Sequence, residues 1–299
     1  MFKNLTLFRL PANAIPSPET LDAALDGARL RPPGPQELAT FGFISPFGRN
    51  HEQLQHRIDR HSLISLGSDA RLLPSQVVNQ TLAERLDELE SQRGRRPGGK
   101  ERTRLKDEVI GELLPRAFIK SSRTDAWLDH GSGWLVADTA SAKAAETVVY
   151  HLRQALGSFP ATPVAAQASA RMQLTAWLAG EDLPEDFELG EECELRDPSE
   201  DGAIVRCRRQ DLGAEEITEH LNAGKQVTQL GLTWDGRMAF VLDEQLTVRK
   251  LRFEDVVLEQ LGDIGGEDAA AELDARFALM TAELTRLLTR LDGLFQLDA

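Results

Sequence analysis

The sequence predicts an α+β fold in which antiparallel strands pack against helices. Two observations favour this class. The dipeptide Asp235-Gly236, a strong hairpin signal, joins strand-like runs at 227–234 and 238–242, and a third such run follows at 245–253. Apolar residues at helical spacing over 142–156 predict a helix, and helices are expected against one face of the meander. With 299 residues, the chain is long enough for two domains or for one large mixed domain.

Strands are expected where apolar residues alternate or run continuously between turn residues. They are predicted, in chain order, at residues 2–10, 61–66, 127–128, 134–137, 172–178, 203–209, 227–234, 238–242 and 245–253. Helices are expected where apolar residues recur three or four positions apart. They are predicted at residues 18–29, from 75 to the basic segment at 93, and at 101–114, 142–156, 214–223 and 273–294.

Capping residues set several of these bounds. Ser17 and Ser141 are expected to be N-caps, because a side-chain oxygen can accept from the free amides of the first turn. Gly157 and Gly224 are expected to end their helices, because glycine tolerates the left-handed conformation that follows a last turn.

The segment from Arg93 to Lys100 contains three glycines and a proline, so it cannot remain helical. Two helices over 75–114 should therefore form a protruding helical hairpin with a basic loop at its tip. We expect a central α+β domain built from 1–74 and 115–180, followed by a C-terminal α+β region over 181–299.

The last predicted helix has the most regular apolar spacing in the chain. Its heptad-like seam consists of Leu273, Phe277, Met280, Leu284, Leu287, Leu291 and Leu294. Such a seam either meets a partner helix or packs on its own domain, and the sequence leaves both possibilities open.

The net charge of −14 argues at first against a polyanionic partner. The charge is unevenly distributed, however, because residues 181–201 and 253–299 each hold eleven acids. In contrast, 91–106 holds seven bases and the single acid Glu101. Local positive charge of this kind indicates either a nucleic-acid contact or a solvated basic loop. The acidic runs themselves are expected to be solvated.

Catalytic and metal-binding patterns are weak, so the sequence predicts no enzyme, cofactor or metal. Gly94 to Lys100 has the spacing of a phosphate-binding loop, but Glu101 stands where a hydroxyl residue is needed. Three histidines spaced five apart, at 51, 56 and 61, are expected at the surface. Cys207 is expected to point inward, and two cysteines without a membrane segment suit the cytoplasm.

Two segments could bind a phosphate backbone without reading sequence. Strand periodicity puts Arg206, Arg208 and Gln210 on one face, with Arg209 on the other face or at the strand end. Around 116–123, three cations surround Phe118, whose side chain is either exposed or part of the core. The candidate DNA-binding residues are Arg93, Arg95, Arg96, Lys100, Arg116, Phe118, Lys120, Arg123, Arg206, Arg208, Arg209 and Gln210.

Several blocks resemble the family of the recombination-associated protein RdgC. They are FKNLTLFRL, LKDEVIGELLPRAF (105–118), SAKAAETVVYHLRQALGS (141–158), RRQDLGAEEITEHLNAGKQVTQLGLTW (208–234) and FALMTAEL (277–284). The resemblance implies a bacterial nucleoid-associated protein that binds double-stranded DNA without sequence preference. It also places Phe118, Arg209 and Gln210 at positions that the family uses functionally.

The same resemblance implies an elongated subunit that forms a ring-shaped homodimer around DNA and negatively modulates the RecA recombinase. In such a ring, the acidic segments would face outward or lie at subunit contacts, and the heptad-like seam is one candidate contact. As an alternative, the chain is a protein-interaction module that acts directly on the recombinase, with DNA binding secondary.

Overall fold

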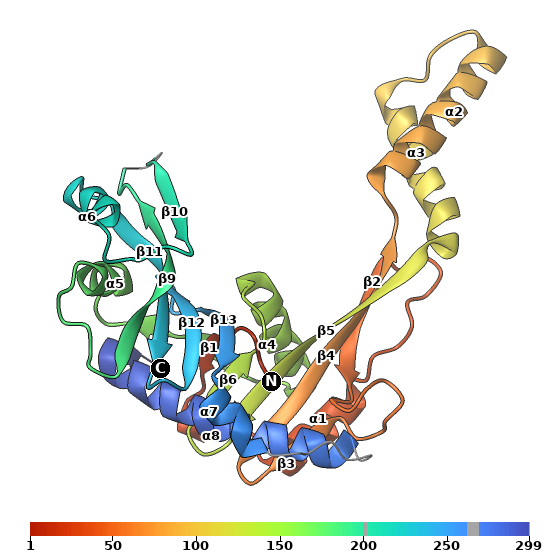
Figure 1. Ribbon diagram of the computed structural model, residues 1–299. Coiled ribbons are helices and arrows are strands. Elements are labelled where there is room, and N and C mark those ends of the chain that lie inside the picture. The colour runs from red at the N-terminus through yellow and green to blue at the C-terminus, as the bar shows by residue number, and fades with distance from the viewer. Residues whose placement is uncertain (200–201, 262–268, 299) are drawn as a thin grey trace. The chain divides into compact units, whose positions relative to one another are not determined.

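The computed structural model describes residues 1–199, 202–261 and 269–298 (Figure 1). Its helices are α1 (Pro18–Gly27), α2 (Ser75–Arg93), α3 (Gly99–Leu113), α4 (Ala142–Leu156), α5 (Ala170–Leu178), α6 (Glu215–Asn222), α7 (Asp255–Leu258) and α8 (Ala269–Phe295). Its strands are β1 (Thr6–Arg9), β2 (Ala39–Ile44), β3 (Gln55–Ile58), β4 (His61–Leu72), β5 (Phe118–Asp129), β6 (Trp134–Ala137), β7 (Thr162–Pro163), β8 (Ala165–Ala166), β9 (Phe187–Arg196), β10 (Ile204–Arg208), β11 (Gln226–Trp234), β12 (Met238–Asp243), β13 (Val248–Phe253) and β14 (Leu297–Asp298). The predicted α+β class with antiparallel sheets is confirmed.

The chain divides into two compact units. Unit 1 comprises Met1–Leu25, Ser45–Ser65 and Thr124–Ala299, and unit 2 comprises Asp26–Ile44 and Leu66–Arg123. Strands β4 and β5 each contribute residues to both units. The three-part division expected from the sequence stays a prediction. Among the described residues, no helix combines the length and the apolar character needed to span a bilayer.

Unit 1 contains a five-stranded antiparallel sheet in the order β10-β9-β11-β12-β13. The predicted hairpin between β11 and β12 is confirmed, and it turns at Asp235 and Gly236 with φ angles of 51° and 59°. Buried side chains of this sheet share one hydrophobic core with α5 and α8, including Trp177 of α5 and Leu284 of α8. Burial of this core is the main force that stabilises the unit.

The other large sheet has the order β2-β4-β5-β6-β1-β7, with β3 paired to β4. The predicted N-caps are confirmed, because Ser17 Oγ accepts from the amide of Thr20 at 3.2 Å and Ser141 Oγ from that of Ala144 at 3.3 Å. Helix α4 ends at Gly157, whose φ of 75° is the left-handed conformation that favours glycine.

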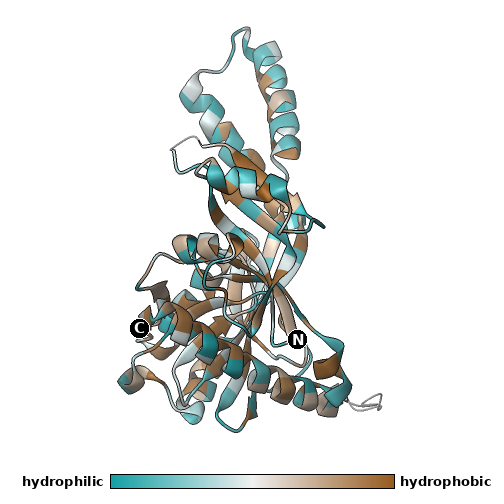
Figure 2. Ribbon diagram, turned by 60° about the vertical axis from the view of Figure 1, so that its left-hand side comes forward, coloured by the Kyte–Doolittle hydropathy of each residue, from teal (hydrophilic) through white to brown (hydrophobic). Residues whose placement is uncertain are grey.

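In unit 2, α2 and α3 lie side by side as a helical hairpin (Figure 1). Helix α2 ends where Gly94 adopts a φ of 67° and donates its amide to the carbonyl of Glu90 at 2.8 Å. Few of the hairpin's side chains are buried, among them Val78, Leu82 and Val109. Hydrophilic residues cover much of both helices in Figure 2, so this hairpin is held by little apolar packing of its own.

One predicted strand is wrong, because residues 172–178 lie in helix α5. Ser169 caps this helix by accepting from the amide of Met172 at 3.4 Å. Leu174, Trp177 and Leu178 are three and four apart and turn one face into the core. The helical period of these three residues outweighs the strand propensity of the segment.

The seam of the last helix packs on its own unit. Phe277, Met280, Leu284, Leu287 and Leu291 are all buried in the core of unit 1. The suggestion that this seam forms a dimer contact is therefore wrong, because its apolar face is already covered. A regular apolar period of about 3.5 residues indicates that one face of a helix is in continuous apolar contact. A sheet and its loops can provide that contact as well as a second helix can.

The acidic run also departs from the expectation. Residues 187–196 form β9, the second strand of the five-stranded sheet, with Cys193 and Leu195 in the core. Glu194 is buried as well, so this part of the run is not a solvated segment. Its alternating apolar positions were masked in the sequence by the acids between them.

Candidate nucleic-acid interface

The two units carry opposite net charges. Unit 2 contains 14 Lys and Arg against 11 Asp and Glu, a net charge of +3. Because the whole chain has a net charge of −14, the net charge of unit 1 is −17. Most of the bases in unit 2 belong to the helical hairpin and to the segment leading into β5. The segregation of charge inferred from the sequence thus follows the division into units.

At the tip of the hairpin, the predicted bases fall into two groups. Arg93 donates to Glu101 at 2.5 Å and Arg96 to Glu90 at 3.0 Å. Arg95 and Lys100 are exposed, and no carboxylate in the described part of the chain lies within 4.0 Å of either side-chain cation. Arg95 and Lys100 are therefore the tip residues best able to exchange water for a phosphate.

The start of β5 presents an aromatic ring among cations. Phe118 is 84% exposed, so the alternative that places it in the core is excluded for this chain. Arg116, in the turn before β5, and Lys120 and Arg123 on the strand are exposed as well. Because side chains alternate along a strand, Phe118 and Lys120 share one face of β5. An exposed ring beside cations is suited to contact a base or an apolar partner surface.

In unit 1, β10 has the predicted alternation. Arg206 and Arg208 are exposed, whereas Val205 and Cys207 turn toward the core. Arg209 follows the last residue of β10 with a φ of 54°, which confirms its predicted place at the strand end. The amide of Gln210 donates to the carbonyl of Glu191 at 3.1 Å. Of the predicted donors, Arg208 and Arg209 lie together at this end of the strand, in the lining of one hollow.

Arg206 is less available than its exposure suggests. Its Nε donates to Oε2 of Glu194 at 2.7 Å, across from it on β9. Burial raises the pKa of the Glu194 carboxyl, but hydrogen bonds from Arg206 and Thr228 outweigh burial and lower this pKa overall. Arg206 is thus the counterion of a buried acid, whereas Arg208 has no carboxylate partner among the described residues.

The two cysteines face each other on neighbouring strands. Cys193 of β9 and Cys207 of β10 are direct partners in the antiparallel register, and neither forms a disulfide. Burial, together with the neighbouring Cys207 thiol, raises the pKa of Cys193 to about 12. The expected inward orientation of Cys207 is confirmed, with a side chain that is half-buried.

A family model described as "Putative exonuclease, RdgC" matches residues 1–297. The chain belongs to the RdgC family. The recombination-associated protein RdgC of Xanthomonas campestris pv. campestris (strain B100) is 50% identical over 298 residues, which cover 99% of this chain and 98% of the relative. The corresponding protein of Xylella fastidiosa (strain M23) is 50% identical over 292 residues, covering 97% and 96%. The resemblance predicted from the sequence blocks is confirmed over nearly the whole chain.

The description of the RdgC family model raises the question of a catalytic centre. Ser62 Oγ lies 2.7 Å from Nε2 of His130, whose Nδ1 lies 2.9 Å from the carbonyl of Pro16. This dyad resembles a nucleophile with its base, but Ser62 is fully buried and cannot meet a substrate. Burial also lowers the pKa of His130, which favours the neutral ring. We interpret the pair as a structural link between β4 and the turn after β5.

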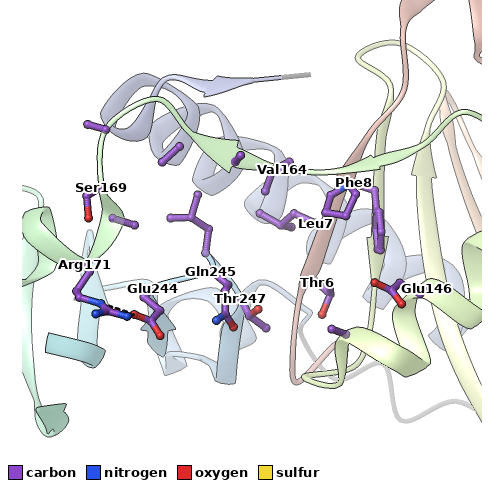
Figure 3. A pocket seen from close by; sticks show the side chains of 17 residues that line it. Thr6, Leu7, Phe8, Glu146, Val164, Ser169, Arg171, Glu244, Gln245 and Thr247 are labelled. Carbon is purple, nitrogen blue, oxygen red and sulfur yellow. Dashed lines mark hydrogen bonds and ion pairs between the residues drawn. The ribbon is translucent and has the colours of Figure 1, made fainter. Parts of the chain in front are cut away.

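A hollow of about 660 Å³ in unit 1 lies among β1, the start of α4, the segment 163–171 and the loop 244–247 (Figure 3). Its charged lining residues are Glu146, Arg171 and Glu244, and Arg171 donates to Glu244 at 2.5 Å. The rest of the lining is largely small or apolar, including Phe8 and Val164. Within the described residues, no three His, Cys, Asp or Glu side chains are grouped to hold a metal.

The expectation that the three spaced histidines lie at the surface is wrong for His56, although it is confirmed for His51. The His56 ring is buried against Phe47 and Phe277, with Nε2 3.1 Å from Asp274. His61 is largely buried and accepts from the indole of Trp127 at 3.1 Å. Burial lowers the pKa of both rings. Both residues lie on strands, where spacing on a helix does not apply.

Sequence reasoning missed three bases that gather with Arg208 and Arg209 in unit 1. Lys3, Lys250 and Arg252 line the same hollow of about 900 Å³ on the five-stranded sheet. The available signal was the run Val248–Phe253, in which Leu251 and Phe253 are buried and the two bases at 250 and 252 are exposed. The partnership with Lys3, more than 240 positions away in the sequence, had no local signal.

Proposed function

We propose that this RdgC-family protein is a sequence-nonspecific double-stranded DNA-binding protein of the cytoplasmic nucleoid. In this proposal it encircles DNA as a ring-shaped homodimer of elongated subunits, and it negatively modulates RecA-dependent recombination. It acts without a catalytic residue, metal or cofactor. The recombination-associated names of its relatives support the process, and the residues below support the mode of action.

The observation that carries the proposal is the set of exposed, partly unpaired bases in unit 2. Arg95 and Lys100 at the hairpin tip and Arg116 and Lys120 near β5 are exposed on a unit of net charge +3. Cations on a protruding hairpin would release counterions from a duplex without requiring a particular base. Of these four bases only Lys100 lies on an α-helix, and the others lie in turns or on β5, so contacts to the backbone are expected.

The test is a gel-shift titration of the full-length protein on random-sequence duplexes at several salt concentrations. The proposal expects log K to fall linearly with log salt, with a slope that steepens by about 0.9 for each phosphate neutralised. A flat dependence would contradict it. Size-exclusion chromatography with light scattering tests the homodimer, and a monomer at micromolar concentration would contradict the ring.

The alternative is a protein-interaction module that acts on the recombinase directly. The net charge of −17 on unit 1 favours it, because an acidic surface suits a basic partner. Its earlier candidate, the apolar seam of α8, no longer supports it, because that seam is buried. Binding to purified RecA without DNA that is lost on charge reversal in 181–201, but not in 93–104, would support the alternative.

A further inference from the structure

The open face of the five-stranded sheet in unit 1 carries a basic hollow that none of the hairpin residues enters. Its floor includes Gly190, Gly231 and Ala239, and the Glu192 side chain lies over Gly231, where it pairs with Lys250. Bases stand at both edges, with Arg208 and Arg209 at β10 and Lys250 and Arg252 on β13. The hollow is therefore a shallow groove with cations on each side.

Backbone hydrogen bonds fix a fifth base beside β13. The amide of Leu251 donates to the carbonyl of Lys3 at 2.8 Å, and Leu5 exchanges two backbone hydrogen bonds with Val248 at 2.8 and 3.0 Å. The N-terminal segment thus extends the sheet edge and holds Lys3 next to Arg252 in the groove lining. This placement brings residues almost 250 positions apart in the sequence into one surface.

The balance of charge in the groove favours an anion. Lys250 pairs with Glu192, but no carboxylate in the described ranges lies within 4.0 Å of the side-chain cations of Lys3, Arg208, Arg209 and Arg252. The remaining acids of the lining are Glu191 and Glu254. Elsewhere in unit 1, bases such as Arg237 and Arg290 form ion pairs with carboxylates. The bases of this hollow differ from them because most have no carboxylate partner among the described residues.

Backbone geometry gives a second indication. Arg209 and Lys250 adopt φ angles of 54° and 52°, in the left-handed region that side chains other than glycine rarely enter. At Lys250 the register between β12 and β13 is irregular, and such bulges re-aim side chains. These conformations fix the direction of the two bases at opposite edges of the groove.

We infer that this groove is a second phosphate-binding surface for duplex DNA, with Lys3, Arg208, Arg209 and Arg252 as its contacting side chains. The inference rests on the proposed DNA-binding function and assigns part of it to unit 1. Lys250 of β13 pairs with Glu192 of β9 across this face, and the four unpaired cations lie around that pair. The occupant is assigned as double-stranded because the proposed function is duplex binding, and spaced backbone contacts without base readout suit a duplex.

The experiment compares the full-length protein with its Lys3→Gln/Arg252→Gln variant in gel-shift titrations on a random duplex. The control is Lys143→Gln/Lys225→Gln, which removes the same charge from unit 1 outside the groove. We expect the groove variant to bind about tenfold more weakly, with a salt slope smaller by about 1.8. The control should bind within about twofold of the parent protein, because distant charges are screened. Thermal unfolding should be unchanged for both variants.

Each outcome separates the two proposals. If the parent protein binds no duplex, the proposed function fails. If the parent binds and the groove variant matches the control in affinity and slope, the groove inference alone is overturned. A loss of affinity for single-stranded DNA that exceeds the loss for duplex would overturn the assignment to double-stranded DNA.

Discussion

Arginine has different partners in the two units. In unit 1, Arg237 donates to Glu283 of α8 at 2.5 and 2.8 Å, and Arg290 of α8 donates to Asp186 at 2.7 and 2.8 Å. These bonds tie a helix to the sheet. At the hairpin tip of unit 2, arginines meet acids only at the surface or, like Arg95, meet none within the described chain. In unit 1, arginine therefore ties α8 to the sheet through these pairs, and the arginines that remain unpaired there, such as Arg208 and Arg252, lie on the open sheet face.

Two phenylalanines mark the extremes of burial. Phe159 of unit 1 is 1% exposed, whereas Phe118 of unit 2 is 84% exposed, although Phe43 of unit 2 is buried. The comparison teaches that net charge describes the whole chain, whereas the proposed DNA binding depends on where unpaired bases gather, at the hairpin tip of unit 2 and on the open sheet face of unit 1.

The largest expected effect comes from truncating matched phenylalanines. Phe159→Ala should destabilise the protein by about 3–5 kcal/mol, because it leaves a cavity in a closed core. Phe118→Ala should change the free energy of unfolding by less than about 0.5 kcal/mol, because the ring is already in water. Urea unfolding followed by circular dichroism measures both. Similar losses for the two variants would mean that Phe118 is packed in solution, against a second copy or its own unit.

The next effect separates buried from exposed ion pairs. Glu283→Ala should cost about 3 kcal/mol, because it leaves Arg237 largely buried without its counterion. Glu90→Ala removes the partner of Arg96, whose pair is exposed, and should cost less than about 1 kcal/mol. Thermal melts at matched concentration measure the difference. Equal costs would show that the hairpin ion pairs are as structural as those of α8.

The pH dependence of stability should follow the ion pairs of α8. The hydrogen bond from Arg237 lowers the pKa of Glu283, and that from Arg290 lowers the pKa of Asp186. A lowered pKa in the folded state contributes stability above the ordinary pKa of the carboxyl and loses it as pH falls through the folded value. Stability should therefore drop between about pH 5 and pH 3.

Urea unfolding at stepped pH tests this loss, with Glu283→Gln as the comparison. The variant lacks one titrating group, so its stability should fall less steeply with acid than that of the parent protein. Parallel curves for the two proteins would show that Glu283 does not contribute to the acid transition.

Local patterns were sufficient to predict much of the fold. Caps at Ser17 and Ser141, the turn at Asp235-Gly236 and the end of α2 at Gly94 all depend on residues within a few positions. Helix α5 was mistaken for a strand, because its short apolar run has no clear period until the burial of Trp177 is known. Strand β9 was hidden by acids whose partners, such as Arg206, belong to another segment.

The candidate site was predictable to a similar extent. Runs of bases at the hairpin tip and on β10 were recognisable in the sequence, and the exposure of their side chains agrees with a surface role. What could not be foreseen was which bases are already neutralised, since the acid that binds Arg206 lies on another strand. Nor could Lys3 be assigned to the edge of β13, because non-local strand pairing leaves no local sequence signal.

The smallest expected effect distinguishes two neighbouring arginines of β10. Arg208→Ala should weaken duplex binding about fivefold, because Arg208 has no carboxylate partner among the described residues. Arg206→Ala should weaken binding less than about twofold, but it should lower stability, because buried Glu194 would lose the charged donor at Oε2 and keep Thr228 as its nearest hydrogen-bond donor. Gel shifts on several unrelated duplexes should show the same loss for each variant on every sequence. A loss confined to some sequences would mean that β10 reads bases, and equal losses for both arginines would mean that DNA displaces Glu194 from Arg206.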